Sequence, residues 1–261
     1  SVPDSGQGWQ RSSRDLAQRF YQFDFHRFGY STSLLPGCPL IQYWDQPAPP
    51  ALLLERMEGW REKNPAWTYH RYDRDSAALF IRFTYGPNLE KSFRDIRLPA
   101  MQADVFRIAA LQALGGVWID AATRCLAPLE GWLNRRQPLV LMRRVHQQHP
   151  KIWNGFISSA APGHPLLVAA WQKIAAALLA RSGERVYRDF GPGVLRDLLA
   201  AGAADPGLQV LQEADLKAQL IVGSSSEALP SDQHWSKRQH HESLYFSGGS
   251  PSDSQRLKDS S

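Results

Sequence analysis

Three residues near the middle of the chain have the types and spacing needed to handle a charged, hydroxyl-bearing ligand. Asp104 and Arg107 lie three positions apart in a stretch with helical periodicity, so their side chains should share one face of that helix. Asp120 directly follows the apolar run Val117–Ile119, which predicts a carboxylate at the end of a short buried strand. An acceptor beside a planar arginine fork can grip sugar hydroxyls or phosphate oxygens. A strand-end carboxylate can hold a divalent cation that neutralises a diphosphate.

The same residues also have a simpler structural explanation. Asp104 and Arg107 could form a surface ion pair, which would contribute little to stability. Asp120 could be an acid that happens to end a strand. Spacing alone leaves the structural and the functional interpretation open.

The elements around these residues follow from the pattern on either side. A helix is predicted from Pro99 through Leu111, because proline suits a first helical turn and apolar residues then recur at helical spacing. Gly115 and Gly116 follow, and glycine commonly ends a helix. In open α/β sheets ligands bind beyond the carboxyl ends of strands, which is where Asp120 should lie.

The rest of the chain alternates helices with short apolar strands, which indicates an α/β domain. Further helices are predicted at about 50–64, 73–81, 164–181 and 193–201, and further strands at about 38–43, 67–72, 139–142, 156–158 and 208–211. Twelve of the 38 residues from Ser224 onward are serine, so a loose tail is expected there.

Composition excludes several classes of protein and favours an anionic partner. The chain has 261 residues, 43% of them hydrophobic, which is long enough to bury a core without disulfides. No stretch of about 18 apolar residues occurs, so no membrane-spanning helix is expected. The two cysteines, Cys38 and Cys125, form no zinc-binding pattern. The net charge of +5 suits phosphates, acidic glycans or an anionic membrane face, but is too small to require nucleic acid.

A resemblance to a known family covers the central motif. The run Ala103–Thr123 (ADVFRIAALQALGGVWIDAAT) resembles the signature of the family 32 glycosyltransferases, which use sugar nucleotides. It is also similar to the capsular-polysaccharide synthesis transferases and to the clostridial glucosylating toxins. Their pattern is an Asp, an Arg three residues on, a Leu, Gly-Gly, an aromatic residue and Asp-x-Asp. Several features in fixed order over about twenty residues are more specific than a lone Asp-x-Asp.

Three weaker similarities extend the resemblance over about 40–200. Ile41–Trp44 resembles the first strand of the family, whose end lies near the nucleotide base, so Tyr43 and Trp44 become candidates for substrate binding. Asn154 begins a segment similar to the one that brings an asparagine to the donor sugar. Gly191-Pro192 is similar to a later Gly-Pro loop of the family.

The resemblance implies a fold, a reaction and a set of site residues. The fold would be GT-A-like, a single Rossmann-type domain over 36–222 with a mixed, mostly parallel sheet and flanking helices. Outside the part that resembles the family, the helical spacing of Leu16, Phe20 and Phe23 predicts a helical extension over 1–35, and 223–261 would be a partly flexible segment able to close over the active site. The enzyme would transfer a sugar from a UDP- or GDP-linked donor with retention at the anomeric carbon. Four catalytic or substrate-binding groups are implied on this basis: Asp104 and Arg107 on the donor sugar, Asp120 on ribose, sugar or metal, and the pair Gly115 and Gly116 on substrate.

The sequence departs from the family at the second acid of Asp-x-Asp, where Ala122 stands. A cofactor, Mn²⁺ or Mg²⁺, is implied by the resemblance, with Asp120 as one ligand. Thr123 or a tail residue would then have to complete the site. The family closes a C-terminal His-Trp-Ser-like segment over the diphosphate, and the candidates here are His234 as a metal ligand and Trp235 and Lys237 on the substrate. Lys237 could also offset the diphosphate charge without a metal.

A basic stretch between 135 and 151 has two open interpretations: a solvated loop, or a contact for an acidic acceptor glycan, a lipid diphosphate or the inner membrane face. The leading functional hypothesis is a retaining glycosyltransferase of surface polysaccharide or glycolipid assembly, cytoplasmic, with a peripheral contact at the inner membrane as an option. The first rival is a non-catalytic nucleotide-sugar or glycan-binding relative, motivated by Ala122. The second is a basic, Trp-rich nucleic-acid binder, a partner that we do not expect.

Overall fold

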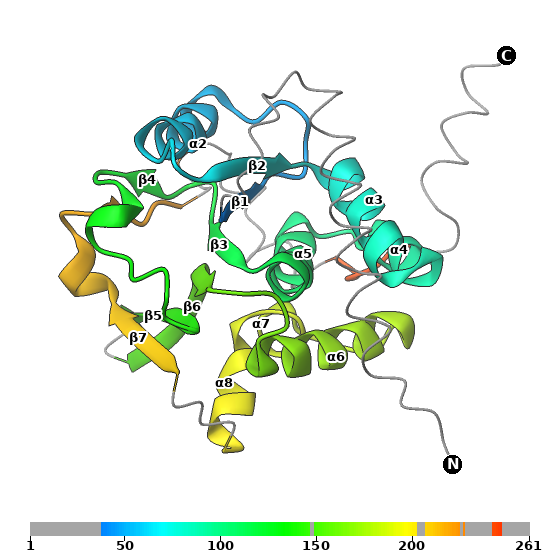
Figure 1. Cartoon of the computed structure of the whole chain (residues 1–261). Coiled ribbons are helices and arrows are strands. Elements are labelled where there is room, and N and C mark those ends of the chain that lie inside the picture. Colours follow the sequence, from blue (N-terminus) through cyan, green and yellow to red (C-terminus); the bar gives the residue numbers. More distant parts are fainter. Residues whose placement is uncertain (1–37, 147–148, 203–206, 225–226, 228–241, 247–261) are drawn as a thin grey trace, which may run out of the picture.

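A six-stranded sheet forms the centre of the protein (Figure 1). The computed structural model describes residues 38–146, 149–202, 207–224, 227 and 242–246. In spatial order the strands are β2 (Thr68–Tyr72), β1 (Pro39–Tyr43), β3 (Gly116–Ile119), β6 (His149–Ser159), β5 (Leu139–His146) and β7 (Leu208–Gln212). β6 pairs antiparallel with both neighbours, and every other pairing is parallel. The predicted α/β fold with a mixed, mostly parallel sheet and flanking helices is therefore confirmed.

Each face of this sheet is covered by a layer of other elements, and the two layers differ in size. One face carries α3 (Arg74–Tyr85), α4 (Pro87–Arg94), α5 (Pro99–Leu114), α6 (Pro165–Leu179), α7 (Val186–Asp189) and α8 (Pro192–Ala200). The other face is covered by α2 (Ala51–Lys63), the short turns η1 (Leu129–Gly131) and η2 (Glu213–Leu216), and the ribbon of β4 (Arg124–Cys125) and β8 (Leu220–Ile221). Figure 1 shows α3 to α6 to the right of the sheet and α2 at its upper left. Each face has its own apolar core.

The alternation along β3 decides which way Asp120 faces. Successive side chains of a strand point to opposite faces. Val117 and Ile119 are buried in the core beneath α2, and Trp118 is buried in the core beneath α5. By the same alternation Asp120, directly after the strand, shares the face of Trp118 and lies on the α5 side of the sheet. Since α5 leads into β3 and must run back along the sheet, its first half lies beside the carboxyl edge, where β3 ends.

The turn from α5 into β3 depends on two glycines with positive φ. Gly115 has a φ of +68° and Gly116 a φ of +87°. A Cβ atom on Gly116 would lie 2.2 Å from the carbonyl oxygen of Pro39, and a Cβ atom on Gly115 would lie 2.8 Å from the backbone of Ala161. This turn stands at the amino edge of the sheet, about 13 Å from Asp120 along a strand that rises about 3.3 Å per residue. The prediction that Gly115 and Gly116 bind substrate is therefore corrected: these glycines serve the turn.

Gly116→Ala is expected to destabilise the protein by at least about 2 kcal/mol, because the new methyl group meets backbone and the residue must keep a left-handed conformation. Urea unfolding followed by circular dichroism measures the change. Gly59→Ala is the matched control, since Gly59 lies within α2 and a Cβ atom there has nothing within 4 Å. That variant should gain about 0.5–1 kcal/mol from helix propensity. Equal stability of the two variants would contradict this account of the turn.

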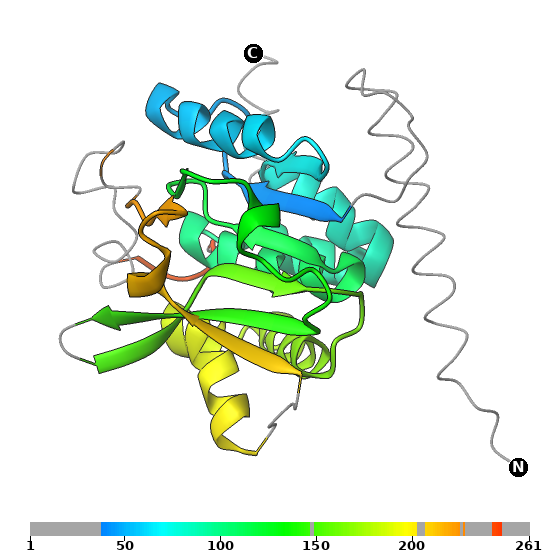
Figure 2. The same cartoon turned by 60° about the vertical axis from the view of Figure 1, so that its left-hand side comes forward.

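The β5–β6 hairpin extends past the carboxyl end of β3. β6 pairs with β3 only through residues 156–159, and its earlier residues pair with β5 alone, after a register shift between Leu141 and Met142. Figure 2 shows the hairpin projecting to the left of the other strands. Arg143 and Arg144 therefore lie in a strand, so the alternative that this part of the basic stretch is a loop is wrong. Among the described residues no helix combines the length and apolar character needed to cross a bilayer.

The last described segment, residues 242–246, packs on the α3–α6 side of the molecule. Leu244 and Tyr245 are buried, and Tyr245 forms an isolated bridge with Ile96 between α4 and α5. The backbone N–H of Arg97 donates to the Leu244 carbonyl at 2.9 Å. Part of the predicted C-terminal segment thus belongs to the core. The predicted helical extension at 1–35 lies outside the described residues.

Candidate functional site

Arg107 bridges the two carboxylates that the sequence singled out. Its Nη1 lies 2.7 Å from Asp104 Oδ1, and its Nη2 lies 2.7 Å from Asp120 Oδ1. The Arg107 side chain is only 3% exposed, so α5 and β3 hold the guanidinium between them, and its Cζ lies over the Trp118 ring, 4.9 Å from the centroid. A guanidinium suits this position because its two terminal nitrogens can each serve a different acceptor. The structure therefore brings Asp104, Arg107 and Asp120 into one cluster.

Two further donors complete the inner side of this cluster. Asn154 Nδ2 donates to Asp104 Oδ1 at 2.8 Å, and Trp118 Nε1 donates to Asp120 Oδ1 at 2.9 Å. Each Oδ1 thus accepts from two side chains. β6, which pairs antiparallel with β3, brings Asn154 to Asp104, and its predicted role in substrate binding stays a prediction. Both carboxyl groups are held in fixed orientations, with their second oxygens left over.

Each leftover oxygen faces a glycine. A Cβ atom on Gly155 would lie 2.5 Å from Asp120 Oδ2, and a Cβ atom on Gly191 would lie 2.7 Å from Asp104 Oδ2. Any larger residue at either place would press on a carboxylate. The Oδ2 atoms accept no hydrogen bond from any described residue. The cluster therefore keeps two acceptor oxygens, Asp104 Oδ2 and Asp120 Oδ2, that no described donor occupies, and the Trp153 ring also packs against Gly155 beside Asp120 Oδ2.

The cluster carries an uneven charge. Two carboxylates and one guanidinium sum to −1 when all are ionised. Burial raises the pKa of Asp104 from 3.8 to about 6, and the charge of Asp120 adds to this rise, whereas Arg107 and the amide of Asn154 oppose it. Asp120 is the solvent-facing member, with 34% of its side chain exposed against 14% for Asp104. A ligand arriving from solvent would meet Asp120 first.

The loop after Asp120 is anchored from α2 and from the C-terminal side. Arg56 Nη1 donates to the Ala122 carbonyl at 2.9 Å, and Trp60 Nε1 donates to the Thr123 carbonyl at 2.8 Å. Arg56 also pairs with Glu227 at 2.7 Å. The hydroxyl of Thr123 is buried and has no hydrogen-bond partner among the described residues. Thr123 is 1% exposed, and its orphaned hydroxyl keeps it a candidate oxygen for completing a metal site.

The possible metal ligands around Asp120 fit a cation that is held by one protein carboxylate. No group of three His, Cys, Asp or Glu side chains close enough to hold a metal occurs within the described ranges. Asp120 offers Oδ2, because its Oδ1 already accepts from Arg107 and Trp118. Mg²⁺ commonly keeps several waters and takes one or two protein carboxylates together with substrate phosphates. The residues present therefore suit an ion that arrives with a diphosphate rather than one caged by protein.

Two predicted residues at the end of β1 differ in their surroundings. Tyr43 is 5% exposed, its ring centroid lies 5.8 Å from that of Phe106, and its hydroxyl donates to Gln102. The prediction that Tyr43 binds substrate is corrected, since this ring belongs to the core. Trp44, the next residue, is half-buried, and its indole N–H has no partner among the described residues. It stays a candidate for substrate binding at the carboxyl edge.

The predicted site residues His234, Trp235 and Lys237 lie outside the described residues. The sequence analysis did not identify Trp118 as a site residue, although its position two residues before Asp120, on the same strand face, could have indicated it. Arg56 gave no such signal, because its contact with the Ala122 carbonyl joins segments that only the fold brings together.

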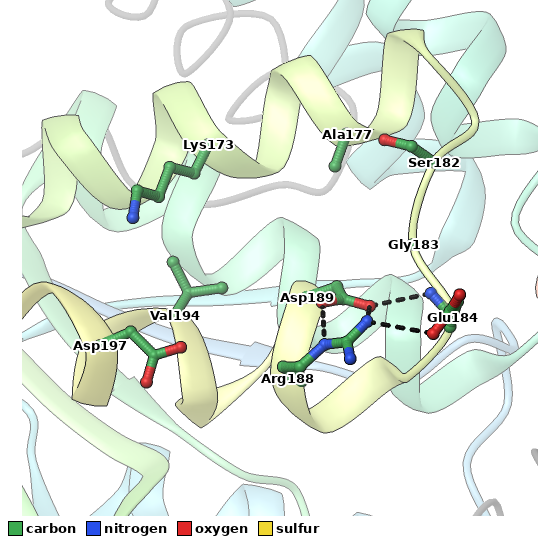
Figure 3. A pocket seen from close by; sticks show the side chains of 9 residues that line it. All are labelled: Lys173, Ala177, Ser182, Gly183, Glu184, Arg188, Asp189, Val194 and Asp197. Carbon is green, nitrogen blue, oxygen red and sulfur yellow. Dashed lines mark hydrogen bonds and ion pairs between the residues drawn. The ribbon is translucent and has the colours of Figure 1, made fainter.

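A separate pocket of about 480 Å³ lies between α6, α7 and α8 (Figure 3). Its charged groups largely satisfy one another: Arg188 pairs with Asp189 and Glu184, as the dashed lines show, and Asp197 pairs with Arg196. The Lys173 side chain also lines it. This pocket contains none of the three clustered residues.

The family of the chain follows from a comparison with known proteins. The family model described as "Capsular polysaccharide synthesis protein" matches residues 42–180, which is more than half of the chain and includes Asp104, Arg107, Asp120 and Asn154. The chain belongs to this family. The resemblance seen in the sequence is thereby confirmed.

Individual relatives are more distant. The chain is 24% identical over 167 residues to an initiation-specific alpha-1,6-mannosyltransferase of Schizosaccharomyces pombe, covering 54% of this chain and 42% of the relative. It is 28% identical over 121 residues to the protein of the same name from Candida albicans, covering 44% of this chain and 31% of the relative. The chain thus spans less than half the length of either yeast protein. Among solved structures, a chain named "PaToxG Glycosyltransferase" is similar at 13% identity and a TM-score of 0.46, covering 74% of this chain and 79% of that one.

Proposed function

We propose that the protein is a glycosyltransferase that moves a sugar from a nucleotide-sugar donor to a glycan or glycolipid in polysaccharide synthesis. The observation that carries the proposal is the bridge of Arg107 between Asp104 and Asp120, with both Oδ2 atoms left over. Membership of the capsular polysaccharide synthesis family supports it. So does the similarity to two proteins named mannosyltransferases.

The two carboxylates suit a sugar and a diphosphate differently. Asp104, buried and pinned by Arg107 and Asn154, suits acceptance of hydrogen bonds from sugar hydroxyls. Asp120, more exposed and on the strand end, suits the diphosphate side of the donor through a cation. Fixed groups of this kind act by positioning the anomeric carbon against an acceptor hydroxyl. The donor would be UDP- or GDP-linked.

The reaction breaks one bond and forms another. The bond from the anomeric carbon to the diphosphate oxygen breaks, and its electron pair leaves on the diphosphate. The acceptor oxygen bonds to the anomeric carbon, and its proton passes to the leaving diphosphate. The sugar passes through an oxocarbenium-like transition state, as in glycoside cleavage. We propose retention at the anomeric carbon.

Negative charge grows on the leaving diphosphate while the cluster itself carries −1, so a positive charge must be fixed beside Asp120. Mn²⁺ or Mg²⁺ bound through Asp120 Oδ2 would supply that charge. The remaining oxygens of its shell would be those of water and diphosphate. Ala122 contributes no side-chain ligand, and its carbonyl is already engaged by Arg56.

The pH profile of kcat/KM for donor hydrolysis is expected to fall on its acidic side with a midpoint near pH 6. Asp104 must be ionised to accept from sugar hydroxyls with both oxygens, and its pKa is raised to about 6 mainly by burial. This folded-state pKa lies above the ordinary value of 3.8. Ionisation of Asp104 therefore reduces the stability of the fold as the pH rises from 3.8 to about 6. Measuring kcat/KM for donor hydrolysis from pH 4.5 to 8 tests the limb. Asp104→Asn should retain little activity and lose the limb, and a limb that persists unchanged in this variant would assign it to another group.

A donor-hydrolysis assay with a panel of UDP- and GDP-sugars, with and without Mn²⁺, tests the proposed function. Turnover of one donor supports it. Tight binding of a donor with no turnover, whatever acceptor is added, would favour the second candidate, a non-catalytic nucleotide-sugar binder. The observation behind that candidate is the alanine at position 122. Absence of both binding and turnover would contradict both proposals.

A further inference from the structure

β6 is irregular beside the end of β3. The register shift between Leu141 and Met142 leaves residues 154–156 of β6 without a counterpart on β5. Extra residues of this kind bend a strand and re-aim its side chains, and they are common next to active sites. Asn154, in this bulge, reaches the cluster. The residue just before it, Trp153, is therefore a candidate for a second contact at the same strand end.

The indole of Trp153 lies beside the unoccupied oxygen of Asp120. A Cβ atom on Gly155 would be 2.2 Å from Trp153 Cζ2, 2.3 Å from its Cε2 and 2.5 Å from Asp120 Oδ2, so these three atoms surround one point. Because Cε2 is bonded to the indole nitrogen, the ring atoms at this point are those next to the N–H group. The backbone N–H of Asp120 also donates to the Gly155 carbonyl at 2.8 Å, which fixes the two segments against each other.

The indole N–H of Trp153 has no acceptor within the protein. No described residue accepts from it, and the nitrogen is accessible to solvent. Two other indoles around the cluster are paired: Trp118 donates to Asp120 Oδ1 at 2.9 Å, and Trp60 donates to the Thr123 carbonyl at 2.8 Å. A partly buried tryptophan commonly has a partner for its N–H. The free donor of Trp153 can therefore serve an acceptor that a ligand brings.

The ring of Trp153 is held in place from outside the site. The Arg144 guanidinium lies over the ring, 5.4 Å from its centroid, and Arg144 Nε is 2.8 Å from Glu213. The indole also packs at the border of the core beneath α2. A donor that is oriented in advance needs no rearrangement when charge develops in front of it.

The position of this donor suits one part of the substrate. An indole nitrogen can only donate. In the proposed function Asp120 holds the diphosphate side of the sugar donor, and negative charge grows there as the sugar leaves. Ala122 contributes no side chain to that charge, and the cluster of Asp104, Arg107 and Asp120 carries −1. A hydrogen bond from an N–H to an ionised oxygen is stronger than one between neutral groups.

We propose that Trp153 is a catalytic residue of this site, whose indole N–H donates to an oxygen of the leaving diphosphate beside Asp120. The inference rests on the proposed function and assigns a further residue to it. Trp153 keeps its proton throughout, while the electron pair of the broken bond stays on the diphosphate. Its part is to lower the energy of that charge.

Trp153→Phe tests the inference because it keeps an aromatic ring and removes only the N–H edge. In donor hydrolysis kcat should fall about 10- to 100-fold, the range expected for one hydrogen bond to a charged group. KM should change less, because the full charge appears on the diphosphate only as the bond breaks. Thermal unfolding of the variant establishes that the chain is folded.

Trp132→Phe is the matched control. Trp132 packs against the same core, and its N–H is buried and has no partner among the described residues, so no ligand can reach it. The same chemical change there should leave kcat and KM as in the wild type.

An NMR measurement tests the contact without turnover. The chain has nine tryptophans, and the indole N–H signal of Trp153 is the one that is lost in Trp153→Phe. In the wild type this signal should move downfield on addition of UDP or GDP with Mg²⁺, as expected for a new hydrogen bond to a charged oxygen. The signal of Trp132 should stay in place.

The outcomes separate this inference from the proposed function. A Trp153 signal that moves with neither nucleotide, or a Trp153→Phe variant with the kcat of the wild type, would overturn the inference and leave Trp153 as a packing residue. Absence of donor hydrolysis by the wild type would contradict the proposed function. A downfield shift of the Trp153 signal with UDP or GDP would, even then, identify this residue as a diphosphate contact.

Discussion

Arg107→Lys is expected to lower kcat/KM for donor hydrolysis about 100- to 1000-fold while the chain remains folded. Lysine keeps the positive charge but has a single ammonium group. It cannot reproduce two separate 2.7 Å contacts, one to Asp104 and one to Asp120, from the planar fork that now makes them. One carboxylate would lose its orientation, and with it the alignment of the donor. The loss should be in kcat more than in KM, because misalignment acts on the reacting geometry.

Arg82→Lys makes the matched control for this substitution. Arg82 pairs with Glu90 at 3.1 Å, and its side chain is 54% exposed, so the same change should cost less than about 1 kcal/mol and leave turnover unaffected. Thermal unfolding of both variants establishes that the chains are folded. Activity of Arg107→Lys within about tenfold of the wild type would mean that the bridge does not align the donor.

Asp120→Asn is expected to reduce turnover about 100-fold and to abolish its dependence on divalent cations. The amide oxygen can still accept from Trp118 and Arg107, so the local geometry should persist. The carboxylate charge is lost, and with it the attraction for a cation at Oδ2. A Mn²⁺ titration of donor hydrolysis, compared between wild type and variant, measures both effects.

Asp197→Asn controls for the loss of a carboxylate elsewhere. Asp197 is half exposed, pairs with Arg196 on α8 and lines the pocket between α6 and α8. It should leave the Mn²⁺ titration unchanged. An Asp120→Asn variant that keeps the metal response of the wild type would place the cation at another residue, and would remove the reason for assigning Asp120 to the diphosphate.

The sequence predicted the core of this cluster because its members are close in the chain or end a regular element. Asp104 and Arg107 share a helical face, and Asp120 shares the sheet face of Trp118 but follows the last residue of the strand. Asn154 came only from the family resemblance, since nothing local says which strand β6 will join. Gly115 and Gly116 were misassigned because a motif that is continuous in sequence spans both edges of the sheet.

The β5–β6 hairpin is the part that local patterns could not reveal. Residues 143–151 contain arginines, histidines, glutamines and a proline, which have little strand propensity. Pairing between the two strands decides their conformation. Likewise α4, with Glu90 and Phe93 buried in a helix that Pro87 begins, is too short for its periodicity to stand out.

The two halves of β6 pair with different strands, so they can change independently of each other. Residues 156–159 are registered by β3, and this fixes Asn154 and Gly155 whatever happens further out along the strand. The outer half of β6 pairs only with β5, beyond the register shift between Leu141 and Met142. Lengthening or shortening the outer half would therefore leave unchanged the pairing with β3 that holds Asn154 and Gly155 beside Asp120.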